Sequence, residues 1–247
     1  MIGIEDIIRH ENHYVRSCAE VAERDYGVLF YNRDNPASHD SNHALILHLE
    51  DDLDAAIADT IAFYRGLGVA PRIYHGFVPR ITEVLLPRLL ARGFKKEVFN
   101  EDYFVCSELS VIKPAAGLEI RRVRKLDPAI RDIFEDEGPW SVGVIARQLQ
   151  RDSYHLLVGY VENVPVTMAA VDETEKVARV DDVMTHSDHR RKGYARALMH
   201  GLVEYHRRVS AAPLYLYSGI PSAIRIYEAA GFRKLDWKPY KWSAWLE

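Results

Sequence analysis

The residues that suggest chemistry most directly form the segment Arg190-Arg191-Lys192-Gly193-Tyr194-Ala195-Arg196, which places four basic side chains around one glycine. Before it lies a segment with β-branched residues, and after it the apolar residues recur every three to four positions. A glycine turn from a strand into a helix presents several backbone N–H groups at the helix N-terminus. Such a turn favours an anion, and pyrophosphate above all. The segment therefore predicts a phosphate-binding turn.

The pattern of this turn is not one of the two widespread phosphate loops, since it matches neither G-x-G-x-x-G nor G-x-x-x-x-G-K-[ST]. It has the form R-x-x-G-x-A. Together with Val183-Met184-Thr185 before it, it resembles the acetyl-CoA pyrophosphate loop of the GCN5-related N-acetyltransferase (GNAT) family. The resemblance implies that pantetheine lies along the strand that ends at Thr185, with backbone bonds at Val183 and Thr185.

A second segment, residues 223–232, looks like the GNAT helix that carries a tyrosine and ends in Gly-Phe, here Tyr227 and Gly231-Phe232. One position departs from the family, which often has asparagine seven residues before the tyrosine, where this chain has Ile220. Either Ser218 or Ser222 takes over that contact, or the contact is absent. The residues that the resemblance assigns to acetyl-CoA are Val183, Met184, Thr185, Arg190, Arg191, Lys192, Gly193, Tyr194, Ala195, Arg196, Ser218 and Tyr227.

The resemblance implies direct transfer, in which an amine attacks the thioester carbonyl without a covalent enzyme intermediate. The chain agrees with this, because Cys18 and Cys106 both lie outside the motifs. The departing thiolate takes a proton from a hydroxyl, and Tyr227 matches the family tyrosine with that role. A lysine-like amine has a pKa near 10.4, so a carboxylate or a water chain must accept its proton before attack.

Asp181 and Asp182 are the candidate bases. Successive side chains of a regular strand point to opposite faces, so only one of the two would face the cleft. Asp181 shares its face with Val183 and Thr185, and we favour it; the structural alternative is an ion pair with Arg179. For two further pairs of residues, the prediction rests only on the chemical type of the side chain. Trp140 and Tyr154 line the acceptor cleft or belong to the core, and His186 and His189 are expected to be exposed.

The elements expected in the second half follow the order of an α/β sandwich with a mixed sheet. We expect strands at 118–123, 154–161, 164–172, 177–185, 213–217 and 238–245, and helices at 127–136, 141–151, 193–208 and 221–230. The predicted fold class is α/β, a mixed-sheet GNAT-like sandwich in the C-terminal half with a related α/β N-terminal domain. The predicted domains are 1–112, a linker at 113–117 rich in Pro, Ala and Gly, and 118–247.

The first half of the chain resembles the second in sequence. Residues 70–76 resemble 212–219, each segment is flanked by helices, and each following helix ends in Gly-Phe, at Gly93-Phe94 and at Gly231-Phe232. A terminal strand is expected to close each copy, at 102–106 and at 240–245. Such a repeat predicts a tandem arrangement. Where the second copy is basic, the first has Leu49-Glu50-Asp51-Asp52, which would repel a pyrophosphate. We therefore expect a degenerate GNAT-like domain, and its loop 31–40 could face the substrate or solvent.

Composition narrows the functional class. The chain has 247 residues, 48% of them hydrophobic, and its net charge of −4 gives no electrostatic case for a nucleic acid or an anionic membrane. The N-terminus is acidic where a signal peptide would be basic, and no stretch approaches the roughly 20 apolar residues of a transmembrane helix. With two cysteines, no disulfide framework is predicted, and we expect a cytoplasmic protein. The 11 histidines lack ligand-like spacing, so no metal is predicted.

The function expected from these observations is an acetyl-CoA-dependent N-acetyltransferase. Its acceptor would be a small-molecule or peptide amine, with neither nucleic acid nor membrane as a partner. Two alternatives stay open. One is a non-catalytic acyl-CoA-binding sensor or regulatory module, which the departure at Ile220 favours. The other is a GNAT-like enzyme that uses a different acyl donor.

Overall fold

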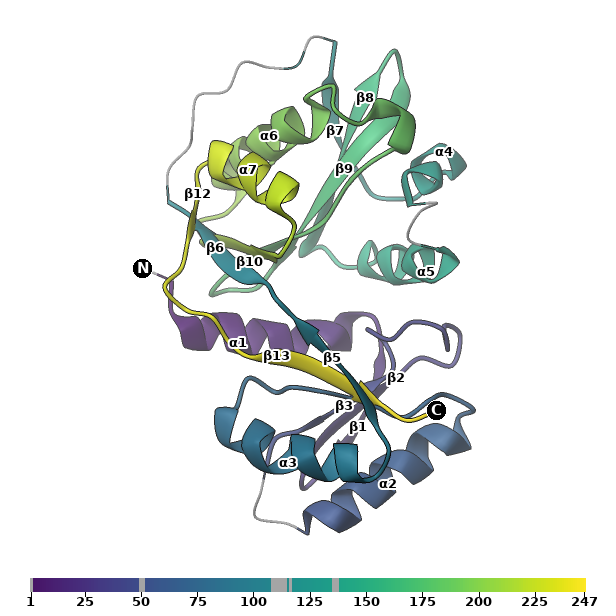
Figure 1. Cartoon of the computed structure of the whole chain (residues 1–247). Coiled ribbons are helices and arrows are strands. Elements are labelled where there is room, and N and C mark those ends of the chain that lie inside the picture. The colour runs from purple at the N-terminus through teal and green to yellow at the C-terminus, as the bar shows by residue number, and fades with distance from the viewer. Residues whose placement is uncertain (1, 49–51, 108–114, 116, 135–137) are drawn as a thin grey trace. The chain divides into compact units, whose positions relative to one another are not determined.

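The computed structural model describes residues 2–48, 52–107, 115, 117–134 and 138–247 (Figure 1). The chain forms two compact units, one made of Glu11–Asn100 with Pro239–Glu247 and the other of Met1–His10 with Glu101–Lys238. The first helix, α1 (Ile4–His13), contributes residues to both. In the described part of the chain, no helix is long and apolar enough to cross a membrane.

The unit that contains residues 11–100 is built on a six-stranded mixed sheet. Its strands, in spatial order, are β1 (Glu20–Arg24), β2 (Gly27–Tyr31), β3 (His43–Ile46), β4 (Arg72–Tyr74), β13 (Lys241–Trp245) and β5 (Lys95–Phe99). Helices α2 (Leu53–Gly66) and α3 (Pro79–Ala91) pack their apolar sides on one face of it, around Tyr64, Ile73 and Trp242. The side chain of Asp52 begins α2 by accepting hydrogen bonds from the N–H groups of Asp54 and Ala55.

The unit that contains residues 101–238 is built on a seven-stranded mixed sheet. Its strands, in spatial order, are β12 (Phe232–Lys234), β6 (Asp102–Cys106), β11 (Leu214–Ser218), β10 (Ala178–Thr185), β9 (Val164–Glu173), β8 (Tyr154–Val161) and β7 (Glu119–Val123). Helices cover both faces (Figure 1). One face carries α6 (Tyr194–Val209) and α7 (Pro221–Ala229), and the other carries α4 (Pro128–Arg131) and α5 (Pro139–Gln148).

The amphipathic pattern of α6 explains its place in this sandwich. Leu198, Leu202 and Val203 recur at helical spacing and are fully buried, whereas Arg207 and Arg208 near its C-terminus are exposed. The second half therefore confirms the predicted mixed-sheet sandwich. The helix expected at 127–136 is shorter than predicted, because α4 gives way to a 3₁₀ turn at Asp132–Phe134. The short strand β12 was not predicted.

The two sheets repeat one pattern of strand directions. In each, two antiparallel pairings are followed by one parallel pairing and then by two antiparallel ones, in the series β1-β2-β3-β4-β13-β5 and β8-β9-β10-β11-β6-β12. The parallel strands β3 and β4 are joined through α2, as β10 and β11 are through α6. This agreement supports the internal repeat that the sequence indicates.

The closing strands are exchanged between the two halves, and this corrects the expected domains. The expectation was that 102–106 closes the first copy and 240–245 the second. Instead β6 lies between β11 and β12, and β13 lies between β4 and β5. The compact units consequently do not coincide with 1–112 and 118–247. Of the expected linker 113–117, only Ala115 and Gly117 lie among the described residues, and residues 49–51 of the acidic segment lie outside them.

Candidate functional site

The parallel strands β10 and β11 pair only at their beginnings. Ala178 pairs with Leu214 and Arg179 with Tyr215, and no further pairing joins these two described strands. On its other side β10 stays paired with β9 as far as Thr185. The backbone of β10 from Val180 to Thr185 therefore has an open edge toward β11, to which another extended chain could hydrogen-bond.

A β-bulge interrupts the pairing of β10 with β9 along the same segment. The register against β9 shifts between Asp181, which pairs with Ala170, and Met184, which pairs with Met168, and Asp182 has a left-handed φ of 51°. Cross-strand partners point to the same face, so Asp181 and Met184 share one face. The prediction from a regular strand, that Asp181 shares its face with Val183 and Thr185, is wrong for this physical reason.

Both carboxylates at the bulge have buried partners. Asp181 forms an ion pair with Arg179, whose side chain is 2% exposed, as the structural alternative foresaw. Asp182 accepts a hydrogen bond from the hydroxyl of Tyr154, which is also 2% exposed. Tyr154 therefore belongs to the core cluster on this face of the sheet. With the bulge, both carboxylates contact buried side chains, whereas a regular strand would direct them to opposite faces.

Tyr227 lies on the buried side of α7, 8% exposed. Burial, together with the nearby charge of Asp181, raises the pKa of Tyr227 to about 12. The phenol therefore keeps its proton at neutral pH.

The turn between β10 and α6 exposes an unbroken series of backbone N–H groups. Gly193 precedes α6 with a left-handed φ of 82°, and Arg191 is also left-handed, with φ 63°. Within the described chain, the N–H groups of residues 191–196 find no acceptor, and the first helical bond runs from Ala197 to Gly193. The side chain of Arg190 does not extend freely, since its Nε donates to the carbonyl of Thr185 at 3.0 Å. The turn therefore offers unpaired donors and positive charge to an anion.

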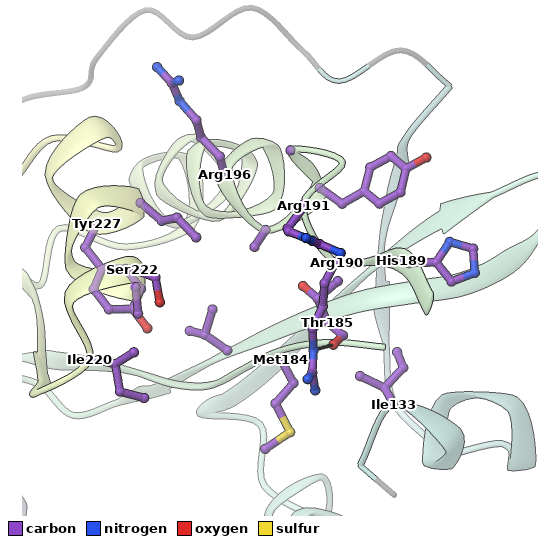
Figure 2. A pocket seen from close by; sticks show the side chains of 16 residues that line it. Ile133, Met184, Thr185, His189, Arg190, Arg191, Arg196, Ile220, Ser222 and Tyr227 are labelled. Carbon is purple, nitrogen blue, oxygen red and sulfur yellow. Dashed lines mark hydrogen bonds between the residues drawn. The ribbon is translucent and has the colours of Figure 1, made fainter. Parts of the chain in front are cut away.

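A cavity of about 680 Å³ joins the bulge, the turn and α7 (Figure 2). Tyr227, Ser222 and Ile220 lie toward one end of it and His189 and Ile133 toward the other, while Arg190 and Thr185 lie between them. Its lining consists of Ile133, Val183, Met184, Thr185, His189, Arg190, Arg191, Gly193, Tyr194, Ala195, Arg196, Ile220, Ser222, Ala223, Ile226 and Tyr227.

Ten of the residues assigned from the sequence line this cavity: Val183, Met184, Thr185, Arg190, Arg191, Gly193, Tyr194, Ala195, Arg196 and Tyr227. Lys192, Ser218, Asp181 and Asp182 are outside the lining. Ser222 lines the cavity and Ser218 does not; the Oγ of Ser218 accepts a hydrogen bond from the N–H of Ile220. Ile220 itself is 62% exposed at the cavity edge.

Four lining residues were not assigned to the site by the sequence reasoning: Ile133, His189, Ala223 and Ile226, of which the last two lie within the motif at 223–232. Ile133 comes from the turn after α4, about 50 residues before the motifs, and no local signal links it to them. His189 was expected to be exposed but is partly buried, and burial together with the charges of Lys192 and His186 lowers its pKa. Its position directly before the basic turn was the available signal. Among the described residues, no cluster of His, Cys, Asp or Glu is arranged to hold a metal ion.

Comparison with known proteins agrees with this geometry. Residues 123–232 match the model of the acetyltransferase (GNAT) family, and no curated protein matches the sequence. A GCN5-related N-acetyltransferase from Kribbella flavida has a similar structure, with a TM-score of 0.70 and 16% identity over 99% of this chain and 96% of that one.

Two other solved structures are also similar. A functionally unknown conserved protein from Staphylococcus epidermidis ATCC 12228 aligns with a TM-score of 0.63 and 16% identity, over 93% of this chain and 94% of that one. A tandem GNAT protein from the clavulanic acid biosynthesis pathway aligns with a TM-score of 0.53 and 12% identity, over 78% and 69% of the two chains. At these identities the similarity concerns the fold. The family model adds that residues 123–232 of this chain are similar to the acetyltransferase (GNAT) family.

Proposed function

We propose that the protein transfers an acetyl group from acetyl-CoA to a small-molecule or peptide amine, at one donor site in the unit that contains residues 101–238. The observation that carries this proposal is the series of N–H groups at residues 191–196 that find no acceptor in the described chain, next to the edge of β10 that is unpaired toward β11. When bound, acetyl-CoA supplies a thioester, a carbonyl activated toward an amine.

The turn holds the pyrophosphate. Its unpaired N–H groups donate to phosphate oxygens at the N-terminus of α6, where the helix dipole adds favourable charge. Arg191 and Arg196 line the same cavity and contribute further positive charge. Gly193 suits this role because the space where its Cβ would stand holds no atom of the described chain within 4 Å. The backbone is therefore accessible to a ligand.

The open edge of β10 holds the pantetheine arm. Val183 and Thr185 are the positions proposed to pair with its amides, as an added strand would. A backbone N–H at the end of the bulged segment would polarise the thioester carbonyl. Apolar side chains of Ala223 and Ile226 line the opposite wall, on α7.

Protons move at two places during the transfer. The amine nitrogen forms a bond with the carbonyl carbon as the C–S bond breaks, and the products are an amide and the free thiol of CoA. Asp181, or Asp182 beside it, accepts the proton that the amine loses, directly or through water. Tyr227 donates to the departing sulfur, and its raised pKa ensures that the phenol is protonated when the sulfur leaves.

The unit with residues 11–100 would bind no donor of its own. Its counterpart of β10 is β3, which pairs with β2 in an uninterrupted register, without a bulge. Its counterpart of α6 is α2, whose N-terminal N–H groups are already capped by the carboxylate of Asp52. This supports the interpretation of the first half as a degenerate GNAT-like copy.

The test is a thiol-release assay with acetyl-CoA and a panel of amines, comparing the wild type with Tyr227→Phe. We expect the substitution to lower kcat about 10- to 100-fold, up to the lower end of the range for a lost general acid, and to leave acetyl-CoA affinity unchanged. Tyr240→Phe, at a tyrosine that is 51% exposed, is the matched control and should not change kcat. Binding of acetyl-CoA without thiol release from any amine would instead support the sensor alternative.

A further inference from the structure

Asp182 occupies a backbone conformation that most residues avoid. Its φ of 51° falls in the left-handed region, at the point where β10 loses register with β9. Aspartate tolerates this region better than most residues, but the conformation still needs support from its surroundings. The surrounding structure must therefore stabilise the backbone conformation of Asp182.

The support comes from Tyr154, on β8, two strands away in the sheet. Its hydroxyl donates a hydrogen bond to the Asp182 carboxylate. Tyr154 pairs across strands with Asp172 on β9, and Ala170 is the next residue of β9 on the same face. Ala170 is fully buried in the same cluster as Tyr154 and has a small side chain, so the phenol can extend past it toward β10.

The tyrosine is fixed as a donor. Burial, reinforced by the nearby charges of Asp182, Asp181 and Asp172, raises the pKa of Tyr154 well above its ordinary value of 10. The phenol therefore stays protonated over the whole range in which an amine substrate reacts. A neutral O–H that donates to a carboxylate forms one of the stronger hydrogen bonds available to a side chain.

The residues that directly follow Asp182 are the ones that line the donor cavity. Val183, Met184 and Thr185 all belong to its wall. Any rotation of the bulge would reorient their N–H and C=O groups as well as the carboxylate. We propose that Tyr154 is a positioning residue for acetyl transfer, holding Asp182 and the β10 bulge in the geometry the reaction needs. This inference rests on the proposed function and adds to it a residue that lies outside the cavity.

The test compares Tyr154→Phe with Tyr160→Phe, a buried tyrosine of the same strand whose ring lies under the guanidinium of Arg121. We expect Tyr154→Phe to lower kcat about 10- to 100-fold, the size of a lost hydrogen bond to a charged group. The KM for acetyl-CoA should stay within about twofold, because the turn at residues 191–196 is unchanged. Hydrogen exchange of the amides of residues 182–185 should become faster. Tyr160→Phe should change neither kcat nor the rate of amide exchange.

A double-mutant cycle with Asp182→Asn identifies the route of the effect. If Tyr154 acts through Asp182, Tyr154→Phe should have little further effect on kcat in the Asp182→Asn background. Additive losses would overturn the proposal. Should Tyr154→Phe fail to fold, Asp182→Asn alone remains decisive, since an unchanged kcat there would overturn the proposal too.

The outcomes separate this inference from the function on which it rests. A wild-type protein that binds no acetyl-CoA would overturn the proposed function, and the role of Tyr154 with it. A wild-type protein that binds and turns over acetyl-CoA, with kcat and amide exchange unchanged by Tyr154→Phe, would overturn the inference alone.

Discussion

A carboxylate introduced at Gly193 should weaken acetyl-CoA binding while it stabilises the free protein. Gly193 has φ 82°, and a Cβ added there would meet no atom of the described chain within 4 Å. A glutamate and a glutamine at this position would therefore share the same backbone cost, about 1–2 kcal/mol for a residue forced into the left-handed region. The two variants differ in charge alone, and their comparison isolates electrostatics.

The size of the effect follows from the distance between the charges. A carboxylate about 5 Å from one phosphate charge is repelled by about 3 kcal/mol at an effective dielectric constant near 20. This corresponds to roughly a hundredfold weaker binding of acetyl-CoA. The stability of the free protein should change in the opposite direction. Because a carboxylate at a helix N-terminus is favourable, Gly193→Glu should be more stable than Gly193→Gln by about 0.3–1 kcal/mol.

The assay is calorimetric titration of wild type, Gly193→Gln and Gly193→Glu with acetyl-CoA, together with urea denaturation of the free proteins. Gly193→Gln should bind more weakly than the wild type only because its side chain crowds the turn, and Gly193→Glu shares this steric effect. Gly193→Glu should bind far more weakly, and raising the salt concentration should narrow the gap between the variants. Equal affinity of Gly193→Glu and Gly193→Gln would refute the assignment of this turn to the pyrophosphate.

Two further predictions concern the unit with residues 11–100. Trp242 is fully buried in its core, so Trp242→Ala should cost about 3–5 kcal/mol and accelerate amide exchange in β3 and β4. Faster exchange confined to β10 and β11 would contradict the strand exchange. Burial lowers the pKa of His43 from 6.5 to about 4, so its neutral form is the native one. The stability it contributes is complete above pH 6.5 and is lost as the pH falls toward 4. In His43→Phe the free energy of unfolding should fall less steeply as the pH decreases from 6.5 to 4. Urea denaturation at several pH values measures this slope, and a slope equal to that of the wild type would contradict the prediction.

The elements around the site were predictable because their signals are local. Residues 194–209 have helical spacing of apolar residues, and Gly193 and Gly231 mark a turn and a helix end. The residues that bind the phosphate-like ligand in our proposal are consecutive in the chain, so one short motif contains them. Their clustering around one cavity follows from a single strand, turn and helix.

The bulge at Asp182 and the exchange of closing strands were not predictable from local signals. The alternation of β10 breaks in the sequence where Asp181 and Asp182 are adjacent, but this break does not by itself identify a register shift, which becomes visible only against Ala170 and Met168 of β9. Strands β6 and β13 are both five-residue strands with aromatic side chains. By composition alone, each of these two strands could belong to either sheet. Which sheet each one joins depends on packing against strands more than 100 residues away in the sequence.

The central claim, one acetyl-CoA site in the unit with residues 101–238, is tested most directly by calorimetric titration of the wild-type protein with acetyl-CoA and with free CoA. We predict micromolar binding with one site per chain, because α6 has an uncapped N-terminus and α2 is capped by Asp52. Two sites per chain would contradict the degenerate role of the first half. Absence of binding would contradict the donor site itself.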